Sequence, residues 1–171
     1  MRHHSAIALS SGLLLVLGAH AVAAQANAYR RIAGTWVMDS TNGPDDHGLP
    51  KSETLVFATT PQGVRITATE DDGKGPATSS FNCASVNGSA ASAKGNASST
   101  TCTVRATADS VAYALDVRNK GALVATERGR LVVSADGESL RDEYDATDGP
   151  KPATHHRHIY NKSAGRTAGS P

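Results

Sequence analysis

The feature that most constrains this fold is a two-residue alternation of apolar side chains with small or polar ones. Between Val111 and Val117, every second residue is large and apolar, and the residues between them are Ala or Asp. Successive side chains of a β-strand point to opposite faces, so this period predicts a strand with one buried face. Residues 64–69 and 140–145 show the same period.

Segments of this kind recur at intervals of about ten residues, separated by turns rich in Gly, Asp and Pro. Residues 122–126 and 130–134 are each strand-like, and the Ser- and Ala-rich stretch 84–101 reads as a loop around one short strand. No segment is a convincing helix. Strands joined in order by tight turns predict an all-β fold, an antiparallel up-and-down meander barrel of eight to ten strands, which leaves no exposed sheet edge.

The core of this barrel must be small. Leu, Ile, Val and Phe make up only about 14% of residues 25–171, and the many Ala, Ser, Thr and Gly residues must fill the remaining space. Such a composition approaches that of disordered chains, but the high net charge that usually accompanies disorder is absent. We therefore expect a folded domain of modest stability that benefits from a covalent cross-link.

The N-terminus has the organisation of an export signal. A short start containing Arg2 is followed by about a dozen apolar residues and then by small residues up to Ala28. The apolar stretch is too short to span a bilayer, and the mature chain has no other such stretch. We expect a signal peptide over residues 1–24, with cleavage after Ala24, Ala26 or Ala28, a barrel domain over 29–162 and a flexible tail over 163–171. The predicted location is the periplasm or the cell exterior.

The chain contains two cysteines, Cys83 and Cys102. In an oxidising compartment a single pair most simply forms one disulfide bond. The spacing differs from the Cys-x-x-Cys of redox-active pairs, so the sequence favours a structural bridge. This bridge would join the two ends of the low-complexity stretch.

The charge balance excludes a dedicated nucleic-acid-binding protein. Removing Arg2 with the signal peptide leaves sixteen basic and sixteen acidic residues, so the mature chain lacks the basic field that attracts a phosphate backbone. No cofactor motif is present, and the sequence carries no signal for an oligomeric state. The partner predicted for this chain is a small lipophilic molecule.

An ordered set of motifs resembles a group of small secreted bacterial proteins with a lipocalin-like barrel and no settled function. The motifs are Gly34-Thr35-Trp36, Ser52-Glu53-Thr54-Leu55-Val56-Phe57, Gly63-Val64-Arg65-Ile66-Thr67, Asp72-Gly73-Lys74, Val133-Ser134-Ala135-Asp136-Gly137-Glu138-Ser139-Leu140, and a last strand that ends in Tyr160. The resemblance covers residues 29–162 and implies that Trp36 closes one end of the barrel. The cysteine pair, the Ser/Ala-rich insert and the histidine cluster depart from the pattern.

Alternation also selects candidates for the barrel interior. The proposed ligand-binding residues are those on the predicted inward faces, Val64, Ile66, Tyr113, Leu115, Asp142 and Tyr144. Asp142 lies between Leu140 and Tyr144 on its face, where a buried carboxyl group would have a raised pKa. The alternative is that this face points outward, or that Asp142 pairs with Arg128 or Arg130.

The run from His155 to His158 is the other unusual feature. In a strand, His156 and His158 point to the same side as Tyr160, and two imidazoles so placed can share a metal ion. A third ligand would have to come from His47, Asp142 or Asp145. His156 and His158 are therefore candidate metal ligands. The alternative is a polar, solvated strand near the chain end that binds no metal.

Three functions are open to such a chain. The first is an exported barrel that binds a small apolar ligand in the periplasm or outside the cell. The second is an envelope-associated structural or interaction protein with a filled barrel and no small-molecule site. The third is an enzyme that uses Asp142 and His156 or His158, although nothing in the sequence requires catalysis. The first rests mainly on fold analogy, and a fold alone does not determine function.

Overall fold

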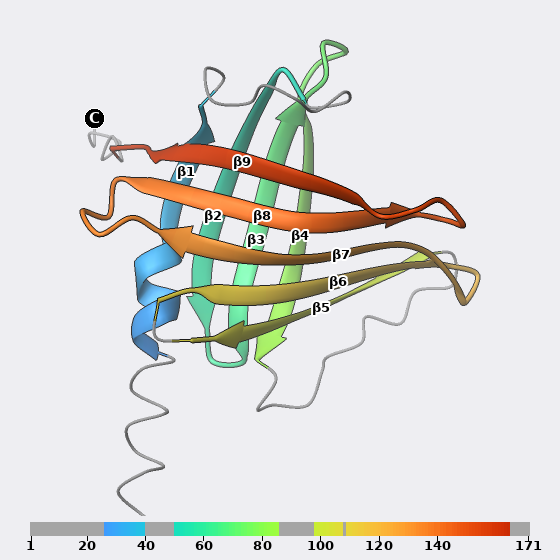
Figure 1. Cartoon of the computed structure of the whole chain (residues 1–171), viewed down its shortest axis with the longest axis horizontal. Coiled ribbons are helices and arrows are strands. Elements are labelled where there is room, and N and C mark those ends of the chain that lie inside the picture. Colours follow the sequence, from blue (N-terminus) through green and yellow to red (C-terminus); the bar gives the residue numbers. More distant parts are fainter. Residues whose placement is uncertain (1–25, 40–49, 86–97, 108, 165–171) are drawn as a thin grey trace, which may run out of the picture.

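A computed structural model describes residues 26–39, 50–85, 98–107 and 109–164 of the chain, and these form a closed barrel (Figure 1). The structure confirms the predicted all-β closed barrel. Its nine strands follow one another around the barrel in sequence order. They are β1 (Gly34–Met38), β2 (Ser52–Thr60), β3 (Gly63–Asp71), β4 (Ala77–Ser85), β5 (Ser98–Ala106), β6 (Val111–Asn119), β7 (Ala122–Val133), β8 (Ser139–Asp148) and β9 (Thr154–Lys162).

The closing pair is antiparallel, with Val37 of β1 opposite Asn161 of β9. A closed ring with an odd number of strands cannot have antiparallel neighbours throughout, because each step around the ring reverses the strand direction. One pair must therefore be parallel, and that pair is β4 with β5. The expectation of an antiparallel meander holds for the other pairs and is wrong for this one.

The strands form two layers that cross. In Figure 1, β1 to β4 run up and down the view, whereas β5 to β9 run across it. Inward and outward residues alternate as predicted. On β3, Val64, Ile66 and Ala68 are buried, and Arg65 between them is exposed.

Two cysteines join the parallel pair. The pairing of β4 with β5 extends over three residue pairs, beginning with Cys83 opposite Cys102, and a disulfide bond connects these two residues. By contrast, the pairing of β5 with β6 extends over nine residue pairs. The predicted bridge is thus confirmed, and it cross-links a junction that has few hydrogen bonds of its own.

A short helix over residues 26–32 corrects the expectation of a helix-free chain. The segment consists mainly of Ala and Arg, which are good helix formers, and its buried residues Ala28, Tyr29 and Ile32 fall on one side of a 3.6-residue period. Three buried apolar residues in about two turns of helix are too few to show a clear 3.6-residue period in the sequence. No helix among the described residues is long and apolar enough to cross a membrane.

The strand boundaries differ from the prediction in one further place. Residues 122–126 and 130–133 belong to a single twelve-residue strand, β7, which continues through Gly129 and ends one residue before the predicted bound. The predicted signal peptide, His47 and residues 86–97 within the low-complexity stretch lie outside the described residues, as does the tail after residue 164. The low-complexity stretch contributes strand at both of its described ends, in β4 and β5.

Candidate ligand-binding cavity

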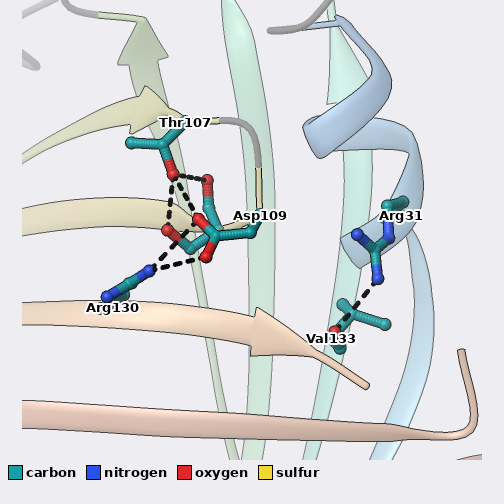
Figure 2. Close-up of polar contacts among 6 residues, drawn as sticks. Arg31, Thr107, Asp109, Arg130 and Val133 are labelled. Carbon is teal, nitrogen blue, oxygen red and sulfur yellow. Dashed lines mark hydrogen bonds and ion pairs between the residues drawn. The ribbon is translucent and has the colours of Figure 1, made fainter. Parts of the chain in front are cut away.

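One end of the barrel is closed by the helix over residues 26–32. The Arg31 guanidinium donates hydrogen bonds to the carbonyl oxygens of Val133 and Ser134, each 3.1 Å away, and the Val133 contact is drawn in Figure 2. The Tyr29 hydroxyl donates to the carbonyl oxygen of Val104 at 3.4 Å. These contacts fix the helix to β5 and β7.

Trp36 completes this closed end. Its indole Nε1 donates to the carbonyl oxygen of Ile32 at 2.7 Å, and the side chain is fully buried. The Lys162 ammonium lies 5.3 Å from the ring centroid, a cation–π contact over the indole. The position of Trp36 agrees with the role that the resemblance implies for it.

The other part of the interior is hollow. A cavity of about 220 Å³ is lined by both apolar and ionisable side chains. The lining residues are Glu53, Leu55, Phe57, Ile66, Ala68, Glu70, Ser79, Phe81, Tyr113, Leu115, Glu127, Leu131, Asp142, Tyr144, His158 and Tyr160. Because Glu70 and Ser79 are also exposed to solvent, they mark the side on which the cavity opens.

The structure brings most of the predicted site residues to this cavity. Ile66, Tyr113, Leu115, Asp142 and Tyr144 all line it. Val64 does not, because it lies nearer the closed end, opposite Cys83, and is packed into the core with 1% of its surface exposed. Alternation identifies the side of the sheet on which a residue lies, but it does not give the residue's level along the barrel axis.

Asp142 faces inward, so the alternative of an outward face is excluded. The Tyr113 hydroxyl lies 3.1 Å from Oδ1 and 3.2 Å from Oδ2 of the carboxyl group and donates to it. Burial raises the pKa of Asp142 to about 7, against the opposing effects of the Tyr113 hydrogen bond and of His158. The pKa of Tyr113 is raised as well, by its own burial and by the nearby Asp142.

The arginines considered as partners for Asp142 pair elsewhere. Arg128 bonds to the carboxyl group of Asp116 on the outside of the barrel. Arg130 reaches both carboxyl oxygens of Asp109 at 3.2 Å, and Thr107 bonds to the same carboxyl group (Figure 2). Neither arginine therefore compensates the charge inside the cavity.

Tyr113 owes its position to a glycine on the neighbouring strand. Gly129 is opposite Tyr113 in the register of β6 and β7, and a Cβ atom at this position would lie 2.5 Å from Cζ of the tyrosine ring. The ring thus lies directly against the glycine backbone. A glycine inside a strand often marks such a close approach. Here the tyrosine ring occupies the space that a side chain at Gly129 would fill.

A second hydrogen-bonded group lies on β2 and β9. The Tyr160 hydroxyl donates to Glu53 Oε2 at 2.6 Å, and His158 Nδ1 lies 3.1 Å from the same hydroxyl. Nδ1 of His158 is also 3.7 Å from the Glu53 carboxyl group. Burial and the Glu53 charge raise the pKa of Tyr160. This group holds a carboxyl group, an imidazole and a phenol in fixed positions at the cavity wall.

Two more carboxyl groups face the same space. Glu70 is opposite Glu53 in the register of β2 and β3, and Glu127 comes from β7 in the other layer. Burial, followed by the charges of Glu53 and Glu70, raises the pKa of Glu127. Burial and the charge of Glu53 raise the pKa of Glu70. Carboxyl groups from both layers therefore line the same cavity.

The histidine cluster divides as the strand period predicts. His155 faces outward and lies 2.9 Å from Asp145, whereas His156 stacks on Tyr144 with 4.9 Å between ring centroids. The rings of His156 and His158 are 6.4 Å apart. Within the described residues, no group of three or more His, Cys, Asp or Glu side chains could hold a metal ion.

Several cavity residues were not identified from the sequence. These residues are Glu53, Leu55, Phe57, Ala68, Glu70, Ser79, Phe81, Glu127, Leu131, His158 as a cavity residue, and Tyr160. The signal for the acidic ones was present, because Glu53 shares the face of Leu55 and Phe57, and Glu127 shares that of Leu131. Glu70 lies within β3, near the end of the strand.

Comparisons with known proteins describe the shape of the barrel only. No protein-family model matches the sequence, and no curated protein matches it. The fold is similar to that of the fluorescent protein UnaG, at 11% identity and a TM-score of 0.46, over 78% of this chain and 98% of that one. It is also similar to secretory abundant heat soluble protein 4 from Ramazzottius varieornatus, at 9% identity and a TM-score of 0.48, over 77% and 94% of the two chains. No function follows from likenesses at this level.

Proposed function

We propose that this chain is an exported binding protein that holds one small, largely apolar molecule inside its barrel. The observation that carries the proposal is the cavity of about 220 Å³ in a barrel whose opposite end is closed. A cavity of roughly 150 Å³ accommodates benzene, and typical small-molecule sites begin at roughly 300 Å³. The ligand is therefore about the size of one substituted aromatic ring or a short aliphatic chain.

The lining supports binding over the alternative of a filled structural barrel. A filled barrel requires side chains that occupy the interior, whereas here Ala68 and Phe57 border open space. The disulfide bond supports the export part of the proposal, because such bonds persist in oxidising compartments.

An enzyme on the same scaffold is the second candidate. Asp142 and His158 are register partners on β8 and β9 and both line the cavity, as that function requires. The two functions differ in the fate of the ligand. A binding protein releases its ligand unchanged, whereas an enzyme releases a product.

The experiment is native mass spectrometry of protein purified from its source, followed by solvent extraction of the bound material. We expect one small molecule bound per chain, and we expect this molecule to be recovered unchanged after incubation with the protein. Ala68→Leu, which places a larger side chain in the cavity, should abolish the bound mass. The matched control Ala135→Leu, in the exposed turn between β7 and β8, should retain it.

A clean extract from the wild-type protein, or an Ala68→Leu variant that binds as well as the control, would contradict binding in the cavity. The intact mass of the denatured protein tests the export proposal in the same experiment. Removal of residues 1–24 is expected, and a full-length mass would oppose it.

A further inference from the structure

The inward face of each strand changes in character along the barrel axis. On β3 the inward residues from the closed end outward are Val64, Ile66, Ala68 and Glu70. On β7 the corresponding series is Val133, Leu131, Gly129 and Glu127. Apolar side chains thus occupy the deep part of the interior, and carboxyl groups lie at the level of the opening.

The outer level of the cavity has one sign of charge. Glu53, Glu70 and Glu127 contribute carboxyl groups at this level, and Asp142 adds one deeper in the cavity, opposite Leu131. No Lys or Arg occurs among the described residues that line the cavity. The imidazole of His158 is the lining group that can carry a positive charge in this part of the chain. A ligand carboxylate would therefore meet groups of like charge at the position where its polar end must lie.

Most of these carboxyl groups are withdrawn from solvent, whereas Glu70 is exposed. Glu53 has 9% of its surface exposed and Asp142 has 7%, and Glu127 is half-buried. Keeping several carboxyl groups together in a partly buried space is unfavourable, because each ionised group loses hydration and repels the others. A positive charge placed between them would reduce both costs.

Resting on the proposed function, we propose that the ligand is a small amine, with its ammonium group among Glu53, Glu70 and Glu127 and its apolar body directed toward the closed end. The apolar part then lies against Leu55, Phe57 and Ile66, which line the deeper cavity. Aromatic rings at the outer level, such as that of Tyr144, add a favourable surface for a cation.

The test uses three probes that share one ring and differ in the polar end: 2-phenylethylamine, 2-phenylethanol and 3-phenylpropanoate. Binding to the disulfide-bonded protein is measured by isothermal titration calorimetry at neutral pH, where the amine is protonated. We expect the amine to bind about tenfold more tightly than the alcohol, and the carboxylate to bind more weakly than the alcohol.

Variants locate the effect. Glu127→Gln should reduce the affinity for the amine about tenfold and leave that for the alcohol nearly unchanged. Glu70→Gln, at an exposed position of β3, should reduce the affinity for the amine by a smaller factor. Glu138→Gln, in the exposed turn between β7 and β8, is the matched control and should change neither affinity.

Equal affinities for the amine and the alcohol, or tightest binding of the carboxylate, would overturn the amine proposal while leaving a ligand-binding barrel intact. An effect of Glu138→Gln equal to that of Glu127→Gln would also overturn it. If none of the three probes binds, the amine proposal fails, whereas the proposed function is decided separately by the bound mass in native mass spectrometry.

Discussion

The two ends of the barrel use the same strands in different ways. At the closed end, Ile32, Trp36 and Val111 are almost completely buried and belong to one hydrophobic cluster. The space beside Ile32 and Val111 is only about 10 Å³. At the hollow end, Glu53, Glu127 and Asp142 occupy inward positions, and the space between them is left open. The difference shows that the inward side of a strand does not by itself make a core. The core forms where the inward residues are apolar and a further element, here the helix, covers them.

The largest effect is expected for truncation at the closed end. Trp36→Ala removes a fully buried ring together with its hydrogen bond to Ile32, and it should reduce the free energy of unfolding by about 3–5 kcal/mol. Phe57→Ala at the hollow end should cost less, because part of the Phe57 ring borders the cavity instead of packed atoms. Urea unfolding of both variants measures the difference, and equal losses would show that the two ends are packed alike.

Removing a charge from the hollow end should instead stabilise the protein. The pKa of Asp142 is about 7 in the folded state, above its ordinary value, so the folded state favours the protonated form. Stability associated with this group is fully present below about pH 4 and is lost as the pH rises to about 7, by up to about 4 kcal/mol.

Asp142→Asn keeps the shape of the protonated side chain and cannot ionise. We expect the variant to be more stable than the wild type at about pH 8 and nearly equal to it at about pH 4, as measured by thermal unfolding at each pH. Asp145→Asn, at an exposed position on the same strand, is the control. A difference between Asp142→Asn and the wild type that does not change with pH would show that burial does not perturb Asp142.

The disulfide bond should contribute somewhat less than Trp36. It closes a loop with a sequence separation of 19 residues, which corresponds to a loss of about 3 kcal/mol when both cysteines are replaced by Ala. Urea unfolding of the double variant gives this value. Under reducing conditions the wild-type protein should unfold at the same urea concentration as the double variant. If both had the urea midpoint of the oxidised wild-type protein, β4 and β5 would hold together without the bridge.

The smallest effect concerns the glycine beneath Tyr113. Gly129→Ala places a Cβ atom too close to the tyrosine ring, so we expect a loss of about 1–2 kcal/mol and displacement of the Tyr113 hydroxyl from Asp142. In a Tyr113→Ala background the same change meets no ring and should be neutral or stabilising. A double-mutant cycle tests this coupling, and additive effects would contradict it.

Much of the architecture follows from the sequence, because a period of two residues is a strong signal even in short segments. The closed barrel was predicted in this way, and the disulfide bond was predicted from the single cysteine pair of an exported chain. Alternation placed Asp142 on the inward face but left the outward face open as an alternative. The helix over residues 26–32 and the parallel pairing of β4 with β5 were not. The helix has too few residues to show a period, and the parallel pairing is a consequence of strand number and closure, which are properties of the whole ring.

The site was predicted only in part, for a related reason. Hydrophobic alternation led to Ile66, Tyr113 and Leu115, but it did not select the glutamates that lie on inward faces. Glu53 and Glu127 occupy inward positions of otherwise apolar faces, which is the pattern that already singled out Asp142. The height of each residue along the axis, which separates Val64 from the cavity, depends on strand stagger and was not available from the sequence.

The most direct test of the account is to find which end of the barrel responds to a ligand. Methyl-labelled protein is titrated with the neutral probe 2-phenylethanol and followed by nuclear magnetic resonance. We predict chemical-shift changes at the methyl groups of Leu55, Ile66, Ala68 and Leu115, and none at those of Ile32, Val104 and Val111. Changes centred on the closed end or on the outer surface, or no changes at all, would contradict the claim that the hollow end is a binding site.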